Sequence, residues 1–202
     1  MNTSGEARPV DHVIIPPAAL VGTSSAAAAR QAFMSLSEAL ARDASSGPQR
    51  LVEETMRATG ADSAGITLED ADKPDELFRW IAVSGEYARY LNGTMPRHFS
   101  PCGEVLLRRR TLVMRDPVRH YPYIQEMHAP IRSALLVPFA RRGRLVGTLW
   151  VLAHTERKQF TTHDVEVVEG LRTFVASLLD AGTASHAVPR AATHQHSGIS
   201  AP

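Results

Sequence analysis

Two runs of mostly apolar residues in the last third of the chain are separated by a short polar turn. The runs cover residues 133–140 and 145–154, with Arg-Arg-Gly-Arg between them. Gly143 in this turn can adopt the positive φ angles that tight hairpin turns require. The pattern therefore predicts an antiparallel β-hairpin that closes a sheet.

The segment after this hairpin carries a complete start signal for a helix. Thr161 can cap the first turn, Asp164 three residues later can complete the capping box, and Phe160 can pack against Val165. Apolar residues then recur at helical spacing until Gly182, which predicts one amphipathic helix. Its apolar face is formed by Val165, Val168, Leu171, Val175 and Leu178, widened by Phe174 and Leu179.

Helical and strand patterns also divide the first part of the chain. Residues 25–42 are rich in alanine with apolar positions on one side, and a second helical pattern follows Ser46-Gly47-Pro48 and stops at Gly60. Strands are predicted at residues 63–69, 77–84 and 112–115. The acidic loop between the first two lacks the alternating ligand spacing of a calcium loop, so we interpret it as a solvated turn.

The order of these elements predicts the fold class. Helices at both ends flank strands with short hairpins, and a long irregular segment precedes the last hairpin. This order is typical of an α+β protein with a central antiparallel sheet, N- and C-terminal helices on one face and a loop region on the other. A small-molecule cavity is expected between that loop region and the sheet.

Composition indicates one domain with two irregular ends. The chain has 202 residues, of which 44% are apolar and 21% charged, which suits one globular core. We expect a flexible arm at residues 1–24, a folded domain at 25–181 and a disordered tail at 182–202. The one apolar run near the start is short and contains two prolines, so no membrane span is expected. The single cysteine fits a reducing compartment, which predicts a cytoplasmic location.

Charge is distributed unevenly along the chain. Residues 1–96 carry 8 basic and 13 acidic side chains, whereas residues 97–150 carry 10 basic and 3 acidic side chains. A basic middle favours an anionic ligand or partner surface, although an arginine run such as 108–110 is also typical of a solvated helix end. No helix-turn-helix, zinc-finger or aromatic-rich RNA-binding pattern accompanies the charge, so nucleic acid is not the expected partner.

Four segments together resemble a known family. Residues 99–107 (FSPCGEVLL), 112–117 (LVMRDP), 134–139 (ALLVPF) and 145–154 (LVGTLWVLAH) are similar to a GAF domain, especially the variety found in bacterial two-component sensors. The similarity covers roughly residues 31–181. It implies an antiparallel sheet of five or six strands (GAF/PAS-like), with a helical dimer face on one side and a ligand pocket on the other.

Specialised branches of that family differ from this chain. Bilin-binding members place the attachment cysteine directly before a histidine, whereas Cys102 here stands in Pro-Cys-Gly. Members that reduce methionine sulfoxide need several cysteines to complete a disulfide cycle, and this chain has one. The resemblance therefore implies a stand-alone, non-catalytic sensor with no catalytic residue and no metal site, and the cofactor stays unknown.

Cys102 has two interpretations. Ser100 and Pro101 are typical of a helix N-terminus, where unpaired amides and the helix dipole lower a thiol pKa. On this interpretation Cys102 is the centre of a redox or electrophile sensor. The alternative is a small buried residue packed where the helix meets the sheet.

Residues 115–132 form the candidate lid of the pocket. Aromatic rings together with arginine forks suit a planar ring that bears a carboxylate or phosphate, although the segment could also be an ordinary solvated loop. Haem ligation by one of its histidines is a further alternative. The expected ligand-binding residues are Trp80, Cys102, Arg115, Arg119, His120, Tyr121, Tyr123, His128, Arg132 and Trp150, with the two tryptophans as core or pocket floor.

The sequence thus predicts a regulatory module that binds a small anionic or planar molecule between the sheet and residues 115–132. Two other functions stay open, a thiol-based sensor or enzyme centred on Cys102 and a ligand-free dimerisation scaffold. The expected partners are the small molecule, a second copy paired through the first and last helices, and a signalling protein in trans.

Overall fold

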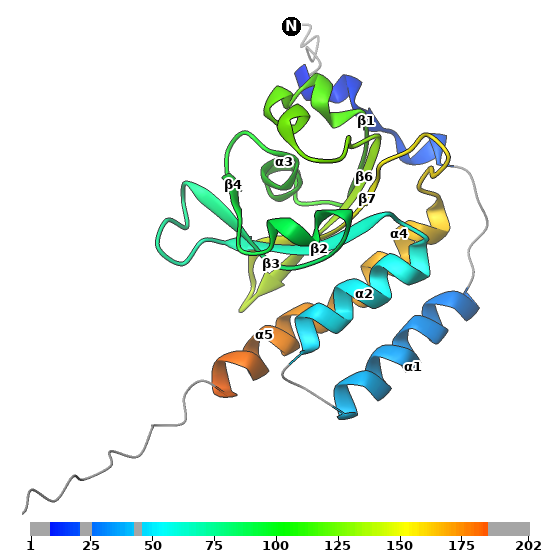
Figure 1. Ribbon diagram of the computed structural model, residues 1–202, viewed down its shortest axis with the longest axis vertical. Coiled ribbons are helices and arrows are strands. Elements are labelled where there is room, and N and C mark those ends of the chain that lie inside the picture. Colours follow the sequence, from blue (N-terminus) through cyan, green and yellow to red (C-terminus); the bar gives the residue numbers. More distant parts are fainter. Residues whose placement is uncertain (1–8, 21–25, 43–45, 186–202) are drawn as a thin grey trace, which may run out of the picture.

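The computed structural model describes residues 9–20, 26–42 and 46–185. Seven strands and five α-helices build this part of the chain, with α1 and α2 at its start and α4 and α5 at its end (Figure 1). The helices are α1 (Ala26–Arg42), α2 (Gly47–Thr59), α3 (Pro101–Arg108), α4 (Thr162–Leu171) and α5 (Thr173–Ser185). The strands are β1 (Ile14–Ile15), β2 (Ser63–Glu69), β3 (Leu77–Gly85), β4 (Thr94–Pro96), β5 (Leu112–Arg115), β6 (Ser133–Arg141) and β7 (Arg144–Ala153).

The seven strands form one antiparallel sheet in the order β1-β5-β6-β7-β2-β3-β4. The predicted hairpin is its centre, because β6 and β7 pair from Ser133–Ala153 to Arg141–Arg144. Arg142 (φ 52°) and Gly143 (φ 79°) both have positive φ in the turn, as a twisted two-residue hairpin requires. The α+β class and the antiparallel sheet are confirmed.

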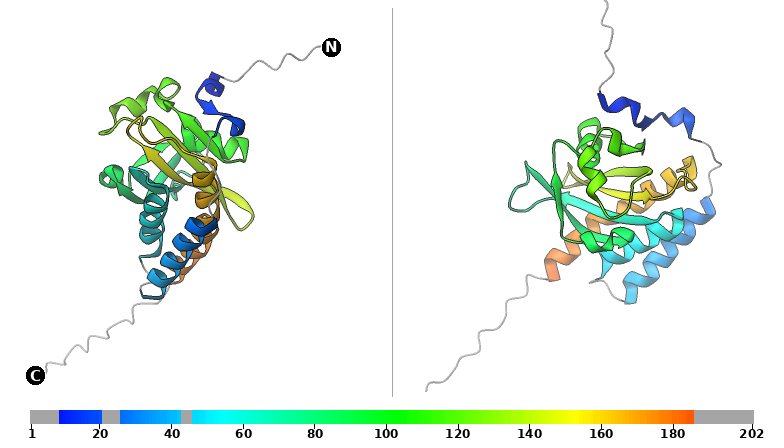
Figure 2. Two further views of the ribbon diagram at one scale, coloured as in Figure 1. Left: turned by 90° about the vertical axis from the view of Figure 1, so that its right-hand side faces the viewer. Right: turned by 45° about the horizontal axis from the view of Figure 1, so that its top comes forward.

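Side chains of the sheet alternate between two separate cores. In β7, Leu149 and Val151 belong to the core under the helices, whereas Trp150 and Leu152 belong to the core on the opposite face. Since successive strand residues point to opposite faces, one strand serves both. Helices α1, α2, α4 and α5 lie together on the first face, and α3 and the loops lie on the other (Figures 1 and 2).

The helix boundaries follow the chemistry of their end residues. Gly60 ends α2 in the left-handed conformation (φ 61°), and the Ser100 hydroxyl caps α3 by accepting from the Gly103 amide. Thr161 and Asp164 form the predicted capping box at α4. The predicted terminal helix is divided, because Arg172 separates α4 from α5, and α5 runs from Thr173 to Ser185.

The edges of the sheet differ from the sequence prediction. Two short strands, β1 and β4, bring the count to seven instead of five or six. β1 comes from residues 9–20, which the sequence analysis assigns to a flexible arm, and here Val10 and Val13 are buried in the second core. Burial of those two valines explains why a segment without periodicity packs on the sheet. Residues 1–8, 21–24 and 186–202, the rest of the expected arm and tail, lie outside the described residues.

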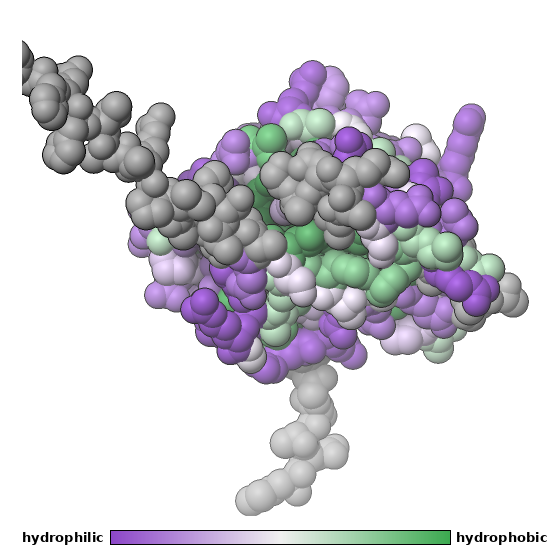
Figure 3. Space-filling view, turned by 90° about the horizontal axis from the view of Figure 1, so that it is seen from below, coloured by the Kyte–Doolittle hydropathy of each residue, from purple (hydrophilic) through white to green (hydrophobic). Residues whose placement is uncertain are grey.

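Apolar side chains gather on the face seen from below in Figure 3, the side on which α1, α2 and α5 lie in Figure 1. On α1, Phe33 is 42% exposed and Met34 is 56% exposed, and the Phe33 ring lies 4.3 Å from that of Phe174 in α5. Pairing of two copies through these helices stays a prediction. Within the described residues, no helix has the length and apolar character to cross a membrane.

Candidate functional site

An apolar cavity of about 150 Å³ lies between the sheet and the loops of the second core. Strands β3, β6 and β7 provide its floor, the first turn of α3 provides one wall, and residues 123–131 cover it. It therefore occupies the predicted place, beneath the long irregular segment. Its main lining residues are Trp80, Tyr87, Met95, Cys102, Tyr123, Ile124, Met127, Ile131, Ala134, Leu136, Trp150 and Leu152.

Aromatic rings form most of the cavity floor. The Trp80 and Trp150 rings meet edge to face with their centroids 6.1 Å apart. The Trp80 centroid also lies 6.4 Å from that of Tyr87 and 5.7 Å from that of Tyr90. The Trp150 ring rests on the backbone of β2, because a Cβ added at Gly65 would lie 2.2 Å from its Cζ2 atom. Glycine at this position is what allows the tryptophan to lie flat against the sheet.

A short chain of hydrogen bonds runs beneath this floor. The Trp150 Nε1–H donates to Thr67 Oγ1 at 2.8 Å, and Thr148 Oγ1 donates to Cys102 Sγ at 3.2 Å. The Cys102 thiol in turn points to Thr67 Oγ1 at 3.7 Å. These contacts satisfy the buried polar groups of two strands and fix both the tryptophan and the cysteine.

Cys102 occupies the first turn of α3, as predicted, and it is buried at 3% exposure. Burial raises the pKa of its thiol, and the hydrogen bonds with Thr148 and Thr67 lower it by less. The structure therefore favours the packed-residue interpretation over an activated thiolate.

Alkylation of the native chain tests this environment. We expect Cys102 to react with iodoacetamide at neutral pH about tenfold or more slowly than free cysteine, because both the thiolate fraction and access are reduced. Urea should restore the rate, and Cys102→Ser should remove all labelling because the chain has one cysteine. A native rate equal to or faster than that of free cysteine would contradict the interpretation.

Tyr123 supplies the polar group of the cavity that lacks a partner. Its hydroxyl is buried and makes no hydrogen bond within the described residues. Burial raises the phenol pKa, and the nearby Cys102 and Tyr121 raise it further, so the group stays neutral at physiological pH. A buried hydroxyl without a partner is costly, which makes it a natural contact for a ligand atom.

The Tyr87 and His154 side chains anchor the covering loop. The Tyr87 hydroxyl donates to the Ala129 carbonyl at 2.8 Å, and the His154 ring bonds the Pro130 carbonyl through Nδ1 at 2.8 Å. Since a carbonyl only accepts, Nδ1 carries a proton, and Nε2 lies 2.8 Å from the Ser63 hydroxyl. The sequence analysis names neither Tyr87 nor His154 as a site residue, because no local pattern shows which loop a strand end meets.

Only some of the ten expected site residues come together. Trp80, Cys102, Tyr123 and Trp150 line the cavity. The three arginines are exposed outside it, and two of them, Arg119 and Arg132, lie 3.8 and 3.7 Å from Asp116. Tyr121 is buried in the second core beside His120, and His128 is exposed. Arg115, Arg119, His120, Tyr121, His128 and Arg132 are thus not part of the cavity lining.

No metal centre is apparent in the described part of the chain, where no three His, Cys, Asp or Glu side chains gather around one point. Besides Thr94, the cavity lining offers the Cys102 thiol and two phenols among apolar side chains, and the Tyr87 phenol already donates to the Ala129 carbonyl. Its chemistry is therefore that of a binding site for an apolar molecule with one polar atom.

Comparison with known proteins identifies relatives of this fold. A family model for the GAF domain matches residues 49–180. A search of curated proteins finds no match.

Several solved structures have the same fold at low sequence identity. The GAF domain of a phosphoenolpyruvate-protein phosphotransferase from Acinetobacter is 16% identical, with a TM-score of 0.63 over 81% of this chain and 95% of that chain. Free methionine-R-sulfoxide reductase from Neisseria meningitidis, in complex with its substrate, is 18% identical, with a TM-score of 0.60 over 82% and 98%. A phycoerythrobilin-bound GAF domain from a cyanobacterial phytochrome is 15% identical, with a TM-score of 0.58 over 83% and 100%.

Proposed function

Because this chain belongs to the GAF domain family, whose members are small-molecule-binding sensory modules, we propose that it is a regulatory module that senses a small planar molecule. The ligand occupies the cavity between the sheet and the covering loop. It is mostly apolar, has about the size of one aromatic ring and carries one hydrogen-bonding atom.

The observation that carries this proposal is the cavity with its unpartnered Tyr123 hydroxyl. An apolar cavity of about 150 Å³ is large enough for a molecule such as benzene. A ring in this space would contact Trp80 and Trp150, and an acceptor atom on the ring would accept a hydrogen bond from the Tyr123 hydroxyl. Both requirements describe a single substituted ring.

The volume of the cavity distinguishes the proposed ligand from a tetrapyrrole such as the bilin of a phytochrome GAF domain. A tetrapyrrole contains four such rings and exceeds the volume of about 150 Å³. The sequence analysis left an anionic and a planar ligand open, and the planar one is favoured because the arginines of residues 115–132 lie outside the cavity lining. Desolvating a full charge among apolar side chains without a cation would be costly.

Signalling follows from the position of the covering loop. Tyr123, Ile124 and Met127 line the cavity and belong to the segment that Tyr87 and His154 anchor to the sheet. A ligand shifts the loop only as far as it binds one loop arrangement better than another. We propose that a signalling protein in trans recognises the ligand-bound arrangement and that the module acts without catalysis.

A thermal-shift titration with phenol and toluene tests the binding site. Phenol at ten times its Kd should stabilise the folded chain by roughly 1.4 kcal/mol. Tyr123→Phe should weaken phenol binding about three- to tenfold through loss of one hydrogen bond, and should leave toluene binding unchanged. Toluene is the matched control because it has the same ring without the acceptor. Absence of stabilisation by either compound, or an equal loss for both, would contradict the proposal.

A further inference from the structure

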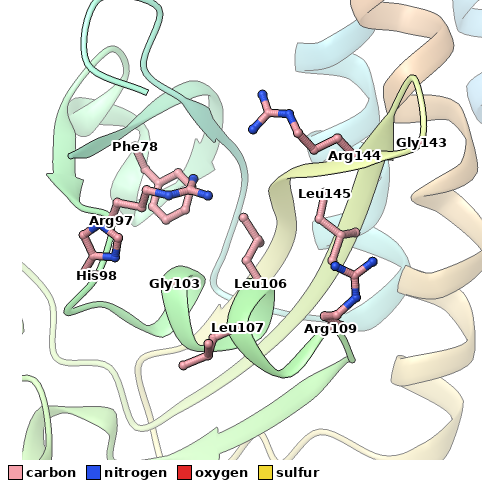
Figure 4. A pocket seen from close by; sticks show the side chains of 10 residues that line it. All are labelled: Phe78, Arg97, His98, Gly103, Leu106, Leu107, Arg109, Gly143, Arg144 and Leu145. Atoms are coloured by element: carbon pink, nitrogen blue, oxygen red, sulfur yellow. The ribbon is translucent and has the colours of Figure 1, made fainter. Parts of the chain in front are cut away.

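A second and larger hollow lies on the other side of α3 from the cavity. It has a volume of about 470 Å³, within the range of roughly 300–1,000 Å³ that is common for small-molecule sites. Figure 4 shows its apolar floor, with Phe78 and Leu106 facing Leu145 of the β6–β7 hairpin. We call this hollow the arginine groove.

Three arginines from separate elements stand around the apolar floor (Figure 4). Arg97 precedes α3, Arg109 follows α3, and Arg144 begins β7. Three of the ten basic side chains of residues 97–150 thus line one hollow on the surface. Arginine guanidinium groups bind carboxylates and phosphates through paired hydrogen bonds.

The groove has more arginine side chains than carboxylates to neutralise them. The buried Glu69 lies 2.6 Å from Arg97 Nη1 and 2.5 Å from Arg144 Nη2, so one carboxylate serves two guanidinium groups. Arg109 makes no ion pair with any residue that the structure describes. The groove therefore retains a net positive charge beside an apolar floor.

Arg97 is held in place by the Phe78 ring and the Glu69 carboxylate. Its guanidinium carbon lies 5.2 Å from the centre of the Phe78 ring, which fixes the side chain by a cation–π contact. Its Nη1 atom is buried and touches Glu69 without the alignment of a hydrogen bond. Arg97 therefore contributes a fixed positive charge to the lining of the groove.

We propose that the arginine groove binds a small organic anion, in which a carboxylate or phosphate is attached to an apolar body. The arginines of the lining attract the anionic group, with Arg109 and Arg144 as its exposed contacts, and the apolar body covers Leu106 and Leu145. This site is separate from the cavity, because Pro101 and Cys102 of α3 line the cavity whereas Gly103 and Leu106 line the groove.

Calorimetric titration of the full chain with phenyl phosphate, benzoate and inorganic phosphate tests this site. The double variant Arg109→Gln/Arg144→Gln should weaken binding of the organic anions by about tenfold or more, because two charge-assisted contacts are lost. The matched control is Arg110→Gln/Arg142→Gln, which removes the same charge from exposed positions outside the groove lining. It should change the Kd by less than twofold.

The three probes distinguish the parts of the proposal. The better of phenyl phosphate and benzoate identifies the anionic group, and tighter binding of either than of inorganic phosphate supports the role of the apolar floor. Equal weakening in both double variants would mean diffuse electrostatic attraction and would overturn the site, as would the lack of saturable binding. Phenol binding should be unchanged in Arg109→Gln/Arg144→Gln, and benzoate binding unchanged in Tyr123→Phe, so failure of one site does not decide the other.

Discussion

Trp150→Ala is expected to lower the free energy of unfolding by about 3–5 kcal/mol, the usual cost of truncating a large buried aromatic residue. Trp150 is 3% exposed, its ring packs on the Gly65 backbone and on Trp80, and its Nε1–H donates to Thr67. The substitution removes these contacts together and merges the vacated space with the existing cavity. Thr67 would also lose a buried partner, which adds to the cost.

Urea unfolding followed by far-UV circular dichroism measures this effect. Trp150→Phe is the matched control, because it keeps an aromatic ring on Gly65 while removing the donor to Thr67, and it should be clearly less destabilising than alanine. Phenol affinity should fall in Trp150→Ala, since the cavity loses one wall. A loss of less than about 1 kcal/mol, the mean effect of any substitution, would show that Trp150 is not a central packing residue.

Leu149→Ala is expected to cost about 2–5 kcal/mol. Leu149 is fully buried and points to the opposite face of β7, into the core under α1, α2, α4 and α5. The cavity left there is closed by helices on one side and the sheet on the other, so the surroundings can collapse only in part. The same urea experiment measures the loss.

Trp150→Ala and Leu149→Ala should differ in phenol affinity, although both substitutions destabilise the chain. Leu149→Ala should leave phenol affinity unchanged when binding is measured at a temperature where the variant is folded, because Leu149 does not line the cavity. A parallel loss of phenol affinity in both variants would contradict the separation of the sheet into a packing face and a ligand face.

Most element boundaries could be predicted because local chemistry determines them. The turn at Gly143, the Gly60 stop and the Thr161–Asp164 capping box each involve residues only a few positions apart. The central strands could be predicted for a similar reason, since their apolar runs are long. The edge strands β1 and β4 have two and three residues, too few for a periodic pattern, and they exist because a neighbouring strand is present to pair with them.

The candidate site could be predicted in position but only partly in composition. Tyr123 and the two tryptophans were expected and line the cavity. The arginines and histidines of residues 115–132 were expected there as well, yet they lie outside the lining. The loop turns its apolar side chains inward because the core opposite is apolar, and the charged side chains remain hydrated. Residue types alone do not show that direction in an irregular segment.

The sequence by itself determined the order of the main elements and the two-faced sheet, because these depend on capping, turn chemistry and the two-residue period of strands. The family was indicated by the resemblance of four sequence segments. Only the tertiary structure decided the volume of the cavity, the raised pKa of Cys102 and the gathering of Arg97, Arg109 and Arg144 around one groove. Those properties depend on contacts between residues far apart in the chain, such as Thr67 with Trp150 and Glu69 with Arg144. Burial and electrostatic fields arise only when such distant segments pack together.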